Sequence, residues 1–78
     1  MTLRGLLKTI HPMQKVVVET TNDNGEEMII YSNTAKYVLK NIDSPIVYTN
    51  KKYLDKGVET IYSFKRDEDI YISIIIKK

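Results

Sequence analysis

The stretch Val58–Ile76 reads VETIYSFKRDEDIYISIII, and the rest of the chain is organised around it. Two runs rich in β-branched and aromatic residues flank five consecutive charged residues, which is the pattern of a β-hairpin. Side chains alternate between the two faces of a strand, so the second run has one fully apolar face, made by Ile70, Ile72, Ile74 and Ile76. We therefore expect other elements to cover this face.

The opposite face of the same run carries Tyr71, Ser73 and Ile75. Ile75 makes this end of the strand apolar on both sides, which leaves two alternatives. Either the strand is central in the sheet and covered on both faces, or Ile75 lies in a contact between subunits. A sheet this small also has exposed edges, so a homodimer is a further expectation.

The first part of the chain predicts a helix followed by a hairpin. Thr2 is a suitable N-cap for a short helix through Ile10, and its leucines fall at helical spacing. Residues 14–21 and 26–31 have the composition of strands. The turn Asn22–Gly25 between them contains residues that tolerate positive φ.

The middle of the chain predicts a second short helix over Ala35–Ile42, capped by one of the polar residues 32–34. Its inward-facing residues are expected to be Tyr37, Val38 and Ile42. Ile46–Tyr48 follows as a short strand or an extended segment.

These elements predict a single α+β domain spanning residues 1–78. Its sheet is expected to be small and antiparallel, with about four strands in two hairpins and two short helices on one face. The order would be helix, strand, strand, helix, the optional short strand, strand, strand. The chain has no cysteine, no signal-peptide pattern and no apolar run of membrane-spanning length. We therefore expect a cytoplasmic protein without disulfides and without a membrane partner.

Charge and motifs argue against an enzyme. Twelve basic and ten acidic residues nearly balance, so there is no general electrostatic case for nucleic acid. No glycine-rich phosphate loop or metal-ligand spacing occurs, and His11, the only histidine, is expected to have a turn or capping role. The acidic residues are interpreted as solvated turn charges, namely Asp23, Glu26, Glu27, Asp67, Glu68 and Asp69. No cofactor, metal or catalytic residue is predicted.

One basic stretch interleaves tyrosines with lysines, and together with two residues of the last hairpin it forms the predicted partner-binding set: Tyr48, Lys51, Lys52, Tyr53, Lys56, Lys65 and Arg66. Such a pattern can bind single-stranded nucleic acid by stacking and phosphate contact. Alternatively, Tyr53 and Leu54 tuck under the sheet and the lysines are solvated, since Asp55 and the acidic turn weaken the positive field. A protein-recognition loop is the third interpretation, because tyrosines are common at interface hot spots.

Three segments resemble small accessory proteins encoded in phages and prophages of Gram-positive bacteria. They are LRGLLKTIHPMQKVVV at Leu3–Val18, YLDKGVETIY at Tyr53–Tyr62 and DIYISI at Asp69–Ile74. The middle of the chain, Asn33–Lys52, departs from the family pattern, and a specific partner is expected to bind there. The resemblance implies a small protein of a mobile element that acts in the host cytoplasm by binding, as anti-CRISPR inhibitors of host defence do.

Three functions follow from these observations. The first is direct binding and inhibition of a host protein, such as a defence or nucleic-acid-processing enzyme of the CRISPR–Cas kind. The second is nucleic-acid binding through Lys51, Lys52, Lys56, Lys65 and Arg66. The third is an oligomer that sequesters a small anionic ligand, such as a signalling nucleotide, at a subunit boundary. The first is the function we expect.

Overall fold

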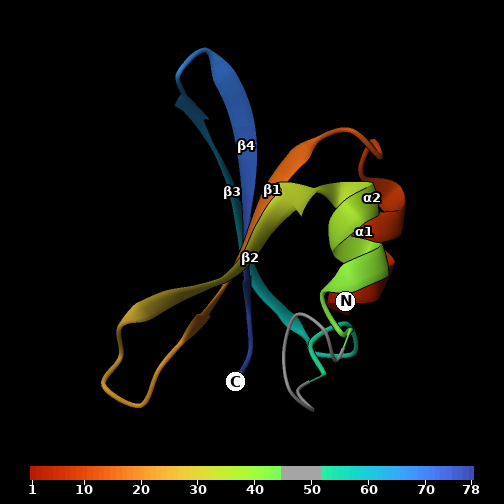
Figure 1. Ribbon diagram of the computed structural model, residues 1–78. Coiled ribbons are helices and arrows are strands. Elements are labelled where there is room, and N and C mark those ends of the chain that lie inside the picture. Colours follow the sequence, from red (N-terminus) through yellow and green to blue (C-terminus); the bar gives the residue numbers. More distant parts are fainter. Residues whose placement is uncertain (45–51) are drawn as a thin grey trace.

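The computed structural model describes residues 1–44 and 52–78 (Figure 1). Within these residues the chain forms two helices and one four-stranded sheet, which confirms the predicted α+β class. The elements are α1 (Leu3–Thr9), β1 (Lys15–Thr21), β2 (Glu27–Thr34), α2 (Ala35–Asn41), β3 (Val58–Arg66) and β4 (Asp69–Ile76). The predicted segment Ile46–Tyr48 lies outside the described residues.

The sheet is mixed, so the prediction of a purely antiparallel sheet is wrong. The strand order is β2-β1-β4-β3. Both hairpins are antiparallel as expected, but β1 and β4 pair in parallel, with Val16 beside Ile72 and Val18 beside Ile74. These are the two most apolar strands, and each is buried on both faces over part of its length. Strands of that kind occupy the centre of a sheet and are typical of parallel pairing.

The predicted covering layer is present, because both helices lie on the same side of the sheet (Figure 1). Ile74 and Ile76 point toward the helices and are almost completely buried, together with Val16 and Val18 of β1. The helices contribute the other half of this core: Leu3, Leu6, Leu7, Ala35, Val38 and, just after α2, Ile42. Burial of these side chains supplies the main stabilisation of so small a domain.

The central position of β4 accounts for Ile75, which is only 9% exposed within a single copy. On the same face Ser73 is fully buried, and its hydroxyl donates to the Glu19 carboxylate of β1 at 2.5 Å. The Tyr62 hydroxyl of β3 also donates to Glu19, at 3.4 Å. The central position that the first alternative requires for this strand is therefore confirmed, and Ile75 is buried within one copy of the chain.

Both helices begin at the threonines that their sequences offer as caps. The Thr2 hydroxyl accepts from the Gly5 N–H at 3.1 Å, and that of Thr34 accepts from the Tyr37 N–H at 3.4 Å. Such caps satisfy N–H groups that have no partner within the helix. The prediction that Tyr37 faces inward is wrong, because its side chain is 51% exposed. Consecutive positions on a helix are about 100° apart, so packing Val38 against the sheet turns its neighbour outward.

The β3–β4 hairpin projects beyond the helices (Figure 1). Its turn is tighter than the charged run suggested, because only Asp67 and Glu68 lie between the strands, with φ of 50° and 71°. Ile70 belongs to the predicted apolar face, yet it is 60% exposed. The helices reach only the other half of β4, so this part of the prediction is wrong.

Candidate functional site: a lysine-lined hollow

Residues 52–57 carry three of the seven predicted site residues, Lys52, Tyr53 and Lys56, and this segment is attached to the start of α1. The backbone N–H groups of Leu3 and Arg4 donate to the carbonyls of Lys56 and Leu54, at 3.0 and 2.8 Å. These donors belong to the first turn of the helix and need partners outside it. The buried Leu54 adds an apolar contact to the core. Helix α1 therefore holds this segment in one position against the domain.

Asp43, which follows α2, holds the same segment from its other side. Its carboxylate accepts from the backbone N–H of Tyr53 at 2.6 Å and from that of Leu54 at 3.3 Å. The carbonyl of Asp43 also accepts from the Lys52 ammonium group, at 3.2 Å. Charge-assisted bonds of this kind are stronger than neutral ones. The side chains of residues 52–56 thus start from a backbone that is fixed at both sides.

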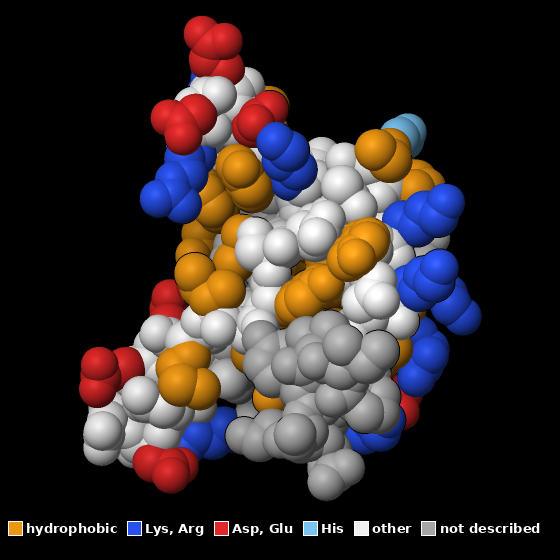
Figure 2. Space-filling view, viewed as in Figure 1, with side chains coloured by type: hydrophobic (Ala, Val, Ile, Leu, Met, Phe, Trp, Pro, Cys, Tyr) orange, Lys and Arg blue, Asp and Glu red, His pale blue; other side chains and the backbone are white. Residues whose placement is uncertain are grey.

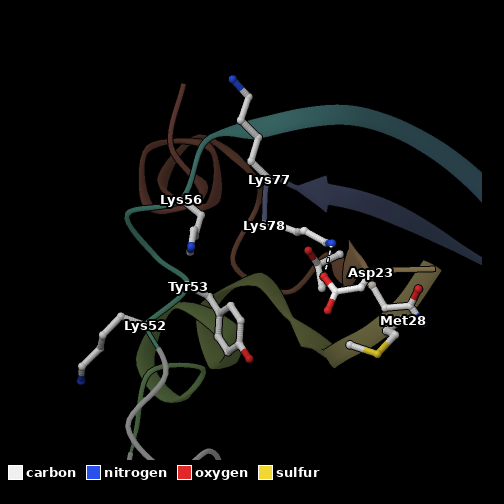
Figure 3. A pocket seen from close by; sticks show the side chains of 9 residues that line it. Asp23, Met28, Lys52, Tyr53, Lys56, Lys77 and Lys78 are labelled. Atoms are coloured by element: carbon white, nitrogen blue, oxygen red, sulfur yellow. Dashed lines mark hydrogen bonds and ion pairs between the residues drawn. The ribbon is translucent and has the colours of Figure 1, made fainter. Parts of the chain in front are cut away.

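A hollow of about 500 Å³ opens between this segment, the β1–β2 hairpin and the chain end after β4 (Figure 3). We call it the lysine hollow. The described residues that line it come from three separate parts of the chain: Thr20, Asn22, Asp23, Met28, Lys52, Tyr53, Lys56, Lys77 and Lys78. Its volume is within the range of small-molecule sites.

The described lining of the lysine hollow is strongly basic, with four lysines against one acidic side chain, Asp23. Asp23 pairs with the Lys78 ammonium group at 2.5 Å. Figure 3 shows Lys56 and Lys78 extending toward the hollow, whereas Lys52 and Lys77 extend away from it at the rim. The positive charge therefore exceeds what Asp23 neutralises, and the hollow attracts an anionic group.

Tyr53 and Met28 give the lysine hollow an apolar surface beside its charges. Tyr53 is half-buried. Burial raises the pKa of its hydroxyl above the ordinary value, and the negative charge of Asp43 adds to the increase. The hydroxyl is therefore protonated at neutral pH. A ligand in the hollow would meet a neutral aromatic ring as well as ammonium groups.

The predicted partner-binding set is only partly assembled. Lys52, Tyr53 and Lys56 line the hollow together, with Tyr53 and Leu54 tucked in as one interpretation expected. Lys65 and Arg66 lie beside the β3–β4 turn, at the opposite end of β4 from the hollow. Tyr48 and Lys51 lie outside the described residues.

Sequence reasoning missed the lining residues that come from elsewhere in the chain, above all Met28, Lys77 and Lys78. One signal could have found the two lysines. They follow directly after the buried run Ile74–Ile76, at the C-terminal end of the central strand β4. Because β1 runs parallel to β4, the turn of the β1–β2 hairpin lies at the same end of the sheet.

The remaining candidates have structural roles in the described part of the chain. The Nδ1 atom of His11 accepts from the Met13 N–H at 3.1 Å, which fits the predicted turn role. Asp69 pairs with Lys15 at 2.6 Å, and Asp23 with Lys78, so these two acidic residues are paired rather than simply solvated. Within residues 1–44 and 52–78 no group of three or more His, Cys, Asp or Glu side chains could hold a metal ion.

Membrane spanning by a helix finds no support either, since neither described helix has the length and apolar character to cross a bilayer. Comparison with known proteins gives no relative: no family model, curated protein or solved structure matches this chain.

Proposed function

We propose that the protein is a non-enzymatic binding protein whose lysine hollow takes an acidic segment of a partner protein. The observation that carries this proposal is the placement of Lys56 and Lys78 on two sides of the half-buried Tyr53 (Figure 3). Ammonium groups around an aromatic ring provide charge for carboxylates and an apolar surface for the side chains between them.

The distribution of charge favours a protein segment over a long nucleic acid. A nucleic-acid strand is usually bound along a continuous basic stripe. Here the basic residues near the β3–β4 turn are separated from the lysine hollow by the length of the sheet. Lys15, at the start of β1, is paired with Asp69, so its charge does not connect the two basic regions. Acidic side chains mark the tips of both hairpins (Figure 2). A short acidic segment needs only the hollow itself.

The resemblance to phage accessory proteins adds the expectation that the partner is a host protein and that binding inhibits it. Inhibition needs no chemistry from this chain, because occupancy of a functional surface is enough. Defence proteins that handle nucleic acid are the expected class of target. The acidic segment would then lie beside the target's own functional surface.

The experiment is a binding measurement with a fluorescent acidic peptide that alternates glutamate with tyrosine. Lys56→Glu combined with Lys78→Glu reverses two charges at the hollow. Lys36→Glu combined with Lys40→Glu makes the same change of net charge on the exposed side of α2. We expect the first variant to lose about tenfold or more in affinity and the second to stay near the unmodified protein. Equal losses of affinity in the two double variants would show that only the net charge of the protein matters, and this would contradict the proposal.

A small anionic ligand such as a nucleotide is the second candidate, because the Tyr53 ring beside lysines also suits a base with its phosphates. The same two variants decide this case with ATP as the probe. Tighter binding of ATP than of the peptide, lost only in the Lys56 and Lys78 variant, would replace the acidic segment by a nucleotide. Binding of short single-stranded DNA with a steep salt dependence would favour the nucleic-acid function instead.

A further inference from the structure

The face of the sheet that points away from the helices carries a row of aromatic rings. Both helices lie on the other side, so neither of the two described helices covers this face (Figure 1). Phe64 of β3 and Tyr71 of β4 are stacked, with ring centroids 5.3 Å apart and 9° between the ring planes. Tyr62 continues the row, with its centroid 6.3 Å from that of Phe64. We call the rings and the side chains in contact with them the aromatic face: Lys15, Glu19, Tyr62, Phe64, Tyr71 and Ser73.

The two charged side chains of the aromatic face differ in how they are compensated. At one end of the row the Lys15 ammonium group lies over the Tyr71 ring, 5.7 Å from its centroid, and it pairs with Asp69 at 2.6 Å. At the other end Glu19 lies beside Tyr62. No lysine, arginine or histidine within residues 1–44 and 52–78 forms an ion pair with Glu19. Its carboxylate is therefore the charge that the aromatic face leaves uncompensated.

The Glu19 carboxylate is half-buried and held in one orientation by two hydroxyl groups. The buried Ser73 hydroxyl donates to Oε2 at 2.5 Å, and the Tyr62 hydroxyl donates to the same oxygen at 3.4 Å. Among the described residues no donor reaches the other oxygen, Oε1. A carboxylate that has lost part of its hydration gains from a further cationic donor. Oε1 is thus an oriented acceptor next to an aromatic ring.

An arginine side chain suits this combination of an aromatic ring and a carboxylate. Its planar guanidinium group stacks on aromatic rings and donates hydrogen bonds to carboxylates, whereas the lysine ammonium group is a compact and strongly hydrated charge. A nucleic-acid strand also stacks on rows of rings. Here Glu19 would repel its phosphates, and Lys15, the cation beside the rings, is already paired with Asp69. The charge of the aromatic face therefore favours a basic ligand.

We propose that the aromatic face binds an arginine side chain of a partner protein, with the guanidinium group stacked on Tyr62 and donating to Oε1 of Glu19. Ser73 is a positioning residue, because its buried hydroxyl holds the carboxylate from beneath the ligand. The contact of Lys15 with Tyr71 is an internal example of a cation on the same row of rings. None of the six residues lines the lysine hollow, so this inference is independent of the proposed function.

The carboxylate is tested with a fluorescent peptide of alternating arginine and serine. Glu19→Gln removes the charge and keeps an acceptor for the Ser73 hydroxyl, and we expect it to weaken binding about fivefold or more. Glu27→Gln on the exposed part of β2 makes the same change of net charge and should leave the affinity near that of the unmodified protein. No binding of the peptide, or equal losses in the two variants, would overturn the proposal.

The ring is tested by comparing this peptide with one that has lysine in place of arginine. We expect the unmodified protein to bind the arginine peptide about threefold or more tightly than the lysine peptide. Tyr62→Leu should abolish this preference, and the fold should tolerate it because the side chain is 43% exposed. Tyr37→Leu on α2, at a side chain 51% exposed, is the matched control and should keep the preference. Equal affinities of the unmodified protein for both peptides would contradict stacking of a guanidinium group.

Two other occupants of the aromatic face would give different results. Tighter binding of short single-stranded DNA than of the arginine peptide, lost in Tyr62→Leu, would assign the rings to nucleobases. A dimer in sedimentation equilibrium that Glu19→Gln dissociates would assign the face to a second copy of the chain. Either result would overturn the proposal.

Discussion

The Asp43 carboxylate accepts a hydrogen bond from the backbone N–H of Tyr53 at 2.6 Å, across ten positions of the chain. This bond joins the end of α2 to the segment that lines the lysine hollow. The other carboxylate oxygen of Asp43 accepts a second bond, from the Leu54 N–H. One side chain therefore fixes the backbone direction of the segment at residues 53 and 54. The shape of the candidate site thus depends on a residue that does not line it.

Replacing Asp43 should therefore weaken both the fold and the site. Asp43→Ala leaves two backbone N–H groups without their partner, and we expect the free energy of unfolding to fall by about 1–3 kcal/mol. Urea denaturation measures this loss. Asp55→Ala is the control, because it removes only the exposed pair with Arg4 and should cost no more than about 1 kcal/mol. Equal losses in the two variants would show that the Asp43 bonds have no special role.

The isoleucines of β4 offer a matched test of where the core lies. Ile74 is fully buried, whereas Ile70 on the same strand and face is 60% exposed. Ile74→Ala should reduce the free energy of unfolding by about 2–5 kcal/mol, since a buried cavity is left behind. Ile70→Ala should cost well under half of that. Where Ile74→Ala does not fold, Ile74→Val with an expected loss of about 0.5–1.5 kcal/mol replaces it. A larger loss at Ile70 would contradict the described packing.

The β3–β4 turn should be improved by residues that accept positive φ. Asp67 and Glu68 both adopt the left-handed region, which costs an L-residue roughly 1–2 kcal/mol and which Asn-Gly adopts readily. Asp67→Asn combined with Glu68→Gly should raise the free energy of unfolding by about 1 kcal/mol. The entropy that glycine adds to the unfolded chain offsets part of this gain. Thermal and urea denaturation would detect it. A decrease would show that the turn has another geometry.

Stability above pH 10 should depend on Tyr53. Its pKa is raised above the ordinary value of 10.0, mainly by burial. The folded protein keeps this proton at a pH where the unfolded chain has lost it, so the contribution is fully present below pH 10. It is lost as the pH rises through the pKa of the folded state. Tyr53→Phe should therefore show a shallower loss of stability above pH 10 than the unmodified protein, with Tyr37→Phe as the control for loss of one hydroxyl. Identical pH slopes in all three proteins would contradict the burial of Tyr53.

Local sequence patterns predict most of the helices, strands and turns of the fold. The alternation in β4, the threonine caps and the Asn22–Gly25 turn are short-range signals, and each element they predict is present. The parallel pairing of β1 with β4 could not be read from the hairpins alone, since strand order depends on which faces become buried. The near-continuous apolar runs Val16–Val18 and Ile74–Ile76 were the available hint.

The candidate site was predictable only where its residues are neighbours in sequence. Lys52, Tyr53 and Lys56 lie on one segment, and they do line the hollow. Met28 and Lys78 join them through the topology of the sheet, which local patterns do not encode. Arg66 was grouped with the others on charge alone, and the length of the sheet separates it from them.

The most direct test of the central claim is an NMR titration of the ¹⁵N-labelled protein with the acidic peptide. We expect saturable shifts of the backbone amides of Tyr53, Lys56 and Lys78, whereas the amides of Lys36 and Lys40 on α2 should hardly move. Binding through the lysine hollow would produce that pattern. Shifts confined to β3, or spread evenly over all exposed lysines, would contradict the account and show that the lysine hollow is not the binding site.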